Sequence, residues 1–379
     1  MALRDGGLRV TDRKYWVGFN LVTGIGPAKT RMLLSAFDSD LAAAWNADAG
    51  ALQAAGLDRR ALENLLETRT ARDLDAEMER ISVQGVSVLT WEDEEYPRLL
   101  RQIYDPPPVL YVKGQLLPED EWAVAVVGTR VATTYGKEAA TQIAEGLARN
   151  GVTIVSGLAR GIDSTAHRAA LEAGGRTIGV LGCGLDIIYP PENRRLAAQI
   201  IQQGALISEY PLSTPPEGGN FPPRNRIISG ISLGVVIVEA GSHSGALITA
   251  DYALDQGREV FAVPGNIFRR ASQGTNTLIR EGATPVLSVE DILEALNLSL
   301  VSQQQAARAI IPENETESRL LEYLSADPVH VDELGQQVGL PISEVTSALT
   351  LMELKGMVRQ VGGMHYVLAH ERGVEYGID

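Results

Sequence analysis

Short apolar runs recur along the middle of the chain at the spacing that a parallel sheet requires. Seven runs of strand length start about 25 to 29 residues apart, at residues 124–128, 152–157, 177–182, 205–208, 234–239, 259–265 and 284–288. Most are apolar throughout instead of alternating, which favours strands covered on both faces. The pattern predicts an α/β fold, an extended Rossmann-like and mostly parallel sheet with helices on both faces. Two earlier runs, 86–89 and 108–112, extend its edge.

The flanking segments have helical periodicity instead. Residues 1–82 predict a small helical domain, in which Gly24-Ile25-Gly26-Pro27 is typical of a helix-hairpin-helix (SAM-like) turn. Such a turn either contacts a DNA phosphate or simply connects two helices. After the sheet domain, 83–298, a polar segment at 299–314 predicts a linker. Residues 315–379 predict three short helices and a hairpin, the order of a winged helix. Its third helix carries one basic residue, which favours a protein contact over DNA reading.

Charge is distributed unevenly along the 379 residues. The formal net charge is −15, divided as −6 over residues 1–121, −2 over 122–297 and −7 over 298–379. This balance argues against a protein that coats nucleic acid indiscriminately and places any polyanion site in the middle segment. The single cysteine, Cys183, excludes an internal disulfide and a cysteine zinc cluster. Without an apolar leader or membrane span, we expect a cytoplasmic protein.

Glycine and arginine residues follow the predicted strands at the edge where open parallel sheets bind ligands. They are Gly128, Thr129 and Arg130 after the first strand, Gly157, Arg160 and Gly161 after the second, and Ser244 and Gly245 after the fifth. Glycine lets a ligand approach the backbone, and helix N-termini bind phosphate. The same edge should hold the segment Phe221-Pro-Pro-Arg224-Asn225-Arg226, which precedes or begins a helix.

The two arginines of this segment oppose the helix dipole, at a cost of ~0.3–1 kcal/mol each. A bound phosphate between their guanidinium groups and the helix N-terminus removes that conflict. Alternatively, the arginines pair internally with Asp163, Glu209 and Glu239. The first interpretation predicts an anion pocket at this edge.

Other chemistry has little support in the sequence. The segment after the first strand lacks the G-x-G-x-x-G of dinucleotide sites, and Gly136-Lys137-Glu138 lacks the P-loop spacing, so no cofactor is predicted. There is no metal-ligand spacing. An acid/base set could be built from His167, Asp163, Glu239, Ser242 and His243, but Asp163 is placed to cap a helix. A non-enzymatic polyanion pocket with no catalytic residue is the better interpretation.

Several motifs together resemble the DNA-processing protein A (DprA/Smf) family, from about residue 96 to residue 296. They include GTR at 128–130, SGLARGID at 156–163, VLGCGLD at 180–186, FPPRNRII at 221–228, VPG at 263–265 and GTN at 274–276. The resemblance implies a homodimer that binds single-stranded DNA in a basic pocket and loads a RecA-type recombinase on incoming strands during natural transformation. It leaves affinity for duplex DNA open.

Matched onto this family's motifs, the expected phosphate and sugar contacts are Gly128, Arg130, Gly157, Arg160, Gly161, Arg224, Asn225 and Arg226. Thr129 stands where a serine is common in the family, and Phe221, Ser244 and Gly245 complete the predicted DNA-binding set. We expect alanine at Arg130 or Arg224 to weaken DNA binding and to leave the fold intact.

An enzymatic alternative is a nucleotide or nucleoside-phosphate hydrolase on a related Rossmann-like sheet. In it, Glu239 acts as the acid/base and the loop 241–245 holds phosphate. The loop lacks the P-G-G-x-G-T-x-x-E pattern of phosphoribohydrolases, which counts against this alternative. Substituting Glu239 by glutamine separates the two, because a binder keeps its DNA affinity whereas a hydrolase loses turnover.

Overall fold

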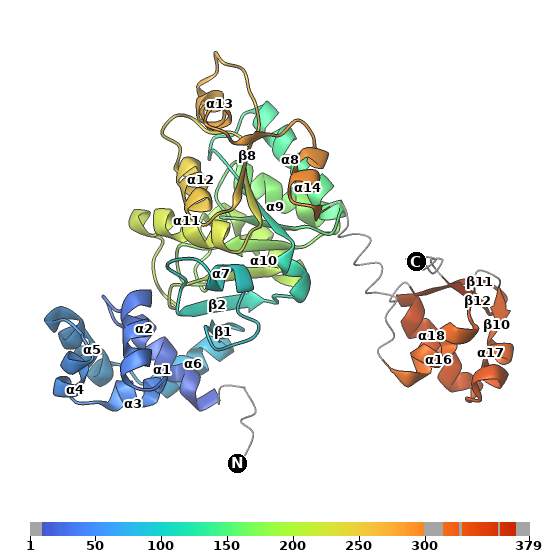
Figure 1. Cartoon of the computed structure of the whole chain (residues 1–379), viewed down its shortest axis with the longest axis horizontal. Coiled ribbons are helices and arrows are strands. Elements are labelled where there is room, and N and C mark those ends of the chain that lie inside the picture. Colours follow the sequence, from blue (N-terminus) through green and yellow to red (C-terminus); the bar gives the residue numbers. More distant parts are fainter. Residues whose placement is uncertain (1–9, 299–313, 326–327, 355–356, 369–379) are drawn as a thin grey trace, which may run out of the picture. The chain divides into compact units, whose positions relative to one another are not determined.

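A mixed sheet of nine strands organises the larger part of the computed structural model, which describes residues 10–298, 314–325, 328–354 and 357–368 (Figure 1). The strands are β1 (Ser87–Thr90), β2 (Val109–Gly114), β3 (Ala123–Val127), β4 (Thr153–Ser156), β5 (Thr177–Val180), β6 (Ala205–Ser208), β7 (Gly234–Ile237), β8 (Glu259–Ala262) and β9 (Thr284–Pro285). Their order is β1-β2-β6-β5-β4-β3-β7-β8-β9. Strand β2 pairs antiparallel with β1 and β6, and all other pairs are parallel. The predicted mostly parallel sheet is confirmed.

Helices cover both faces of this sheet, as the apolar strands predict. They are α7 (Arg98–Arg101), α8 (Thr134–Arg149), α9 (Ile162–Glu172), α10 (Arg194–Gln203), α11 (Phe221–Gly230), α12 (Gly245–Asp255), α13 (Gln273–Arg280) and α14 (Val289–Ala295), with short 3₁₀ turns η1 (Pro118–Glu121), η2 (Pro191–Asn193), η3 (Gly218–Asn220) and η4 (Arg270–Ser272). In β2, Tyr111 packs in the core with α10, whereas its neighbours Leu110 and Val112 pack in the core with α11 and α12. Across the described ranges, no helix has both the length and the hydropathy that a membrane crossing requires.

The chain reverses its direction of travel across the sheet between β3 and β7. From β3 it proceeds through β4 and β5 to β6, and it then returns to place β7 on the other side of β3, followed by β8 and β9. The crossovers after β3 and β7 therefore diverge, which opens a crevice beyond the carboxyl ends of these two strands. Open α/β sheets bind their ligands at such a switch point.

Six helices precede the sheet: α1 (Val10–Leu21), α2 (Pro27–Ala36), α3 (Leu41–Asn46), α4 (Ala49–Ala54), α5 (Arg59–Ala71) and α6 (Leu74–Val83). An aspartate side chain caps the N-terminus of each of the last four, through Asp40, Asp48, Asp58 and Asp73. The predicted glycine turn connects α1 to α2. One continuous apolar core joins these helices to β1, β2 and α10. The predicted domains 1–82 and 83–298 therefore lie within one compact unit, which ends at Ser299.

The second compact unit begins at Leu300 and contains the winged-helix elements. These are α16 (Glu315–Tyr323), β10 (Val329–His330), α17 (Val331–Val338), α18 (Ile342–Leu354), β11 (Val358–Gly362) and β12 (His365–Leu368). The strands pair in the order β10-β12-β11, so the sequence pattern missed β10. The predicted linker, 299–314, lies outside the described residues apart from Asn314, which caps α16.

Candidate functional site

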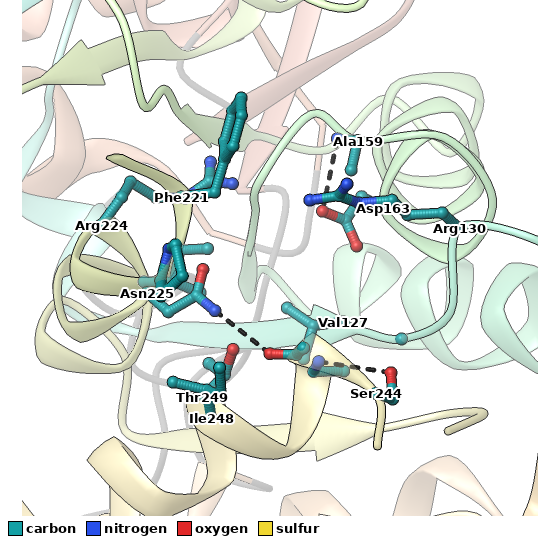
Figure 2. Close-up of a pocket in the computed structure, with 15 residues that line it drawn as sticks. Val127, Arg130, Ala159, Asp163, Phe221, Arg224, Asn225, Ser244, Ile248 and Thr249 are labelled. Carbon is teal, nitrogen blue, oxygen red and sulfur yellow. Dashed lines mark hydrogen bonds between the residues drawn. The ribbon is translucent and has the colours of Figure 1, made fainter. Parts of the chain in front are cut away.

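A cavity of about 370 Å³ lies at the switch point, beyond the carboxyl ends of β3, β4 and β7. Residues from four segments line it: Val127, Gly128 and Arg130 at the end of β3 and just after it; Ala159 and Asp163 after β4; Phe221, Pro222, Arg224, Asn225 and Ile228 from α11; and Ser244, Gly245, Ala246, Ile248 and Thr249 from the N-cap and first turns of α12. Figure 2 shows Arg130 and Asp163 on one side of the cavity and Phe221, Arg224 and Asn225 on the other. The fold therefore brings the predicted loops together around one cavity. We call this cavity the switch-point pocket.

Arg224 is the most deeply placed cation of the pocket, with 4% of its surface exposed. Its Nη1 donates to the carbonyl oxygen of Gly157 at 2.9 Å and to that of Val180, at the ends of β4 and β5. Burial lowers the pKa of Arg224 to about 10, so the side chain stays cationic at neutral pH. Strand-end carbonyls thus offset the conflict between this arginine and the dipole of α11. These two hydrogen bonds also give Arg224 a structural role, because they connect α11 to the ends of β4 and β5.

Asp163 places a carboxylate inside the same pocket. It lies in the first turn of α9, whose N-cap is Gly161, and its Oδ2 accepts hydrogen bonds from the backbone N–H groups of Gly157 at 3.1 Å and Ala159 at 3.3 Å. Burial raises the pKa of Asp163, while Arg224 opposes that rise. The Gly157 amide, predicted as a phosphate donor, is therefore already hydrogen-bonded to an internal anion.

The glycines of the pocket allow close packing between loops. Gly161 has a φ of +75°, and a Cβ there would lie 2.3 Å from the carbonyl oxygen of Thr129. At Gly128, a Cβ would lie 2.6 Å from Ile162 Cγ1. The loops after β3 and β4 could not approach each other this closely with larger residues. The Gly161 backbone thereby packs against the backbone of Thr129 and Arg130.

Arg130 and Phe221 also line a small adjoining cavity, together with Tyr189. Arg130 is exposed, and its guanidinium carbon lies 5.6 Å from the centroid of the Phe221 ring. The guanidinium carbon of Arg224 lies 5.9 Å from the same ring, and the Tyr189 ring lies 5.7 Å from it. A planar base can stack on such rings while the arginines bind phosphate. Tyr189 was not among the residues that the sequence assigned to the site.

The N-terminus of α12 forms the floor of the pocket. The Ser244 hydroxyl accepts a hydrogen bond from Ala246 N at 3.3 Å, and Asn225 Nδ2 donates to the carbonyl oxygen of Gly245 at 3.3 Å (Figure 2). Asn225 thereby ties the start of α12 to α11. Helix N-termini carry partial positive charge, so this floor adds to the positive potential of the two arginines.

Five predicted contact residues lie outside the lining of the switch-point pocket, namely Thr129, Gly157, Arg160, Gly161 and Arg226, although Gly157 and Arg160 line a small adjoining cavity. The Arg226 guanidinium donates to both carboxylate oxygens of Glu209, at 2.6 and 2.7 Å. Burial lowers the pKa of Arg226, but the hydrogen bonds and charge of Glu209 have the larger combined effect, so the pKa is raised overall. Arg160 is exposed and pairs with Glu192. The Thr129 hydroxyl accepts from Val131 N at 3.2 Å. Internal pairing, the alternative interpretation, thus holds for Arg226.

Glu239 is enclosed instead of facing the pocket, with 3% of its surface exposed. Its two carboxylate oxygens accept hydrogen bonds from the backbone N–H of Thr133 at 2.9 Å and from the Thr133 hydroxyl at 2.7 Å. Thr133 in turn caps α8. Glu239 therefore anchors the start of α8, and both of its oxygens are engaged there.

Of the other groups considered for catalysis, His167 is enclosed as well, whereas Ser242 and His243 are exposed. His167 is fully buried beside Thr177, and burial lowers its pKa to about 3. Burial also raises the pKa of Cys183 to about 11, so the thiol packs as a small neutral group. No cluster of metal-ligating side chains occurs among the residues that the structure describes.

The structure defines a Rossmann-like α/β protein with an arginine-lined cavity at the switch point of its sheet. The sequence profile of DNA recombination-mediator protein A matches residues 87–297, and that of the DprA winged-helix domain matches residues 304–364. The chain therefore belongs to the DNA recombination-mediator protein A (DprA/Smf) family. Its members are DNA-processing proteins.

Known relatives match both the sequence and the fold. Protein Smf of Synechocystis is 35% identical over 94% of this chain and 98% of its own, and Protein Smf of Escherichia coli is 40% identical over 83% and 86%. The X-ray structure of DprA from Streptococcus pneumoniae covers 74% of this chain and 97% of its own, with 36% identity and a TM-score of 0.66. DNA processing protein A of Helicobacter pylori, described for its single-stranded DNA binding mode, covers 56% and 95%, with 34% identity and a TM-score of 0.51.

Proposed function

We propose that this chain binds single-stranded DNA in the switch-point pocket. The observation that carries the proposal is the convergence of Arg130 and Arg224 around the Phe221 ring, above the N-terminus of α12. The guanidinium groups pair with phosphates, and the ring stacks on a base. The relative from Helicobacter pylori, for which a single-stranded DNA binding mode is described, supports the same ligand.

The proposed biological role is that of a recombination mediator. A homodimer in the cytoplasm would protect incoming strands and load a RecA-type recombinase on them during natural transformation. Membership of the recombination-mediator family supports this role. A strand-exchange assay with a RecA-type recombinase tests it. We expect this chain to shorten the lag before recombinase filaments form, and an unchanged lag would contradict the loading role.

Salt titration tests the pocket directly. Single-stranded binding that neutralises two to three phosphates gives a slope of log affinity against log salt of about −1.4 to −2.1. We expect fluorescence anisotropy of a labelled oligonucleotide to give a slope in this range, with little dependence on base sequence. A slope near zero would show that phosphate contacts do not drive the binding.

Substituting Glu239 by glutamine separates the binder from the hydrolase. Glutamine presents one carbonyl oxygen in place of two carboxylate oxygens, so one of the two bonds to Thr133 is lost. We expect stability to fall by about 1–3 kcal/mol, while DNA affinity stays within about twofold. Thermal unfolding and anisotropy measure the two effects. A nucleotide-hydrolysing activity in the wild type that this variant abolishes would favour the enzyme.

A further inference from the structure

The loop after β8 exposes two large apolar side chains next to two arginines. Ile267 is 74% exposed and Phe268 is 88% exposed. Arg269 and Arg270 follow directly, are exposed, and form no ion pair with any described residue. Adjacent exposed apolar side chains of this size mark a contact surface. We call residues 266–270 the β8 loop.

This loop is held in one shape by its own hydrogen bonds. The Asn276 side chain accepts from Gly265 N at 3.1 Å and donates to the carbonyl oxygen of Gly265 at 3.0 Å, which fixes the base of the loop to α13. Asn266 Oδ1 accepts from Phe268 N at 2.9 Å. A loop fixed in this way loses little conformational freedom when it binds a partner.

An apolar groove lies between α7 and η1, on the side of the sheet where the parallel strands begin. Its cavity of about 350 Å³ is within the size range of ligand pockets. Its apolar lining includes Tyr96, Leu99, Leu116, Ile178, Ile207 and Ile231. No described part of the chain fills it. We call it the amino-edge groove.

Carboxylates surround the mouth of this groove. Glu94 and Glu95 are exposed and form no ion pair within the described residues. Glu121 pairs with Arg98 across the groove at 3.4 Å, with both side chains at least half exposed. Asp120 is already bound by Arg176 at 2.8 Å. The rim therefore carries an excess of negative charge around an apolar floor, which suits an apolar side chain flanked by cations and repels a nucleic acid.

The β8 loop and the amino-edge groove lie at opposite ends of the same sheet. The loop follows the carboxyl end of β8, whereas η1 precedes the amino end of β3 and Ile178 lies near the amino end of β5. Figure 1 accordingly shows α13, which follows the loop, and α7, which borders the groove, far apart. One copy cannot fill its own groove, but a second copy can.

We propose that the β8 loop of one copy docks in the amino-edge groove of the next. Phe268 enters the apolar cavity, and Arg269 and Arg270 lie against Glu94 and Glu95. The contact joins two different surfaces, so it is heterologous and can continue from copy to copy, unlike the symmetric interface of a homodimer. It requires no DNA, and its test is independent of the proposed function.

Charge reversal tests the contact in solution. Sedimentation velocity of the full chain without DNA should show species larger than a dimer that grow with concentration. We expect R269E/R270E, and separately E94R/E95R, to weaken this association at least tenfold. The control R168E/R280E, which makes the same change of net charge as R269E/R270E at two other exposed arginines, should behave as the wild type. Combining both reversed pairs in one chain should restore association.

Mixing the two reversed variants distinguishes a heterologous contact from a symmetric one. The normal loop of the groove variant fits the normal groove of the loop variant, and the reversed loop fits the reversed groove, so the two variants can alternate along one assembly. We expect the mixture to regain species that grow with concentration, although neither variant forms them alone. Wild-type sedimentation of both variants, or failure of the combined chain to reassociate, would overturn the proposal. Loss of DNA affinity in R269E/R270E with unchanged association would assign the loop to nucleic acid instead.

Discussion

Replacing Arg130 by alanine lowers the affinity for single-stranded oligonucleotides about 10- to 100-fold and leaves the unfolding temperature unchanged. Arg130 is exposed and forms no ion pair with any described residue, so its guanidinium is available to a phosphate. A hydrogen bond to a charged group contributes about 1.5–3 kcal/mol, which corresponds to this range of affinities. Anisotropy at low salt measures the loss, and differential scanning calorimetry checks the fold.

The matched control for this variant is Arg280→Ala. Arg280 is also exposed, but it lies in the last turn of α13, away from the switch-point pocket. The control should retain wild-type affinity, whereas R130A should also reduce the steepness of the salt dependence by about 0.7. Equal losses in the two variants would mean that overall charge, and not the pocket, attracts the DNA.

The sheet could be predicted from sequence because its strands are buried on both faces. The apolar run at 205–208 coincides with β6, and the other parallel strands differ from their predicted runs mainly at the ends. Strand β10 was missed because its two residues are paired by tertiary contact and carry no periodicity. Helix α11 begins at Phe221, because Pro222 and Pro223 fit a first helical turn and extend it towards the pocket.

Sequence could place the pocket, but it could not divide the arginines between ligand and fold. Glycine and arginine after successive strands indicate one edge, and the structure brings them together there. Whether Arg226 meets Glu209 depends on distances that no local pattern encodes. Similarly, Glu239 was a candidate partner of arginine, yet it binds Thr133. The conflict between Arg224 and the dipole of α11 is offset by the carbonyl oxygens of Gly157 and Val180, which the sequence does not reveal.

Arg224→Ala should damage both binding and stability, in contrast to Arg130→Ala. The expectation of an intact fold came from treating Arg224 as a surface contact. Its removal leaves two buried carbonyl oxygens and the Asp163 carboxylate without their cation. Loss of one member of a buried charged pair costs about 3–5 kcal/mol, so we expect the unfolding temperature of the first unit to fall by roughly 10 °C in calorimetry.

The pH dependence of that deficit identifies its cause. Burial already raises the pKa of Asp163 and Arg224 counteracts it, so the variant has an Asp163 pKa still higher than the wild type. A buried carboxyl whose folded-state pKa is raised above its unfolded-state pKa costs stability, and that cost grows as pH rises from the unfolded-state pKa through the folded-state pKa. We therefore expect the deficit of R224A to be larger at pH 8 than at pH 5, and Asp163→Asn in the same chain to remove most of this difference. A deficit that is constant with pH would assign the loss to the two carbonyl bonds alone.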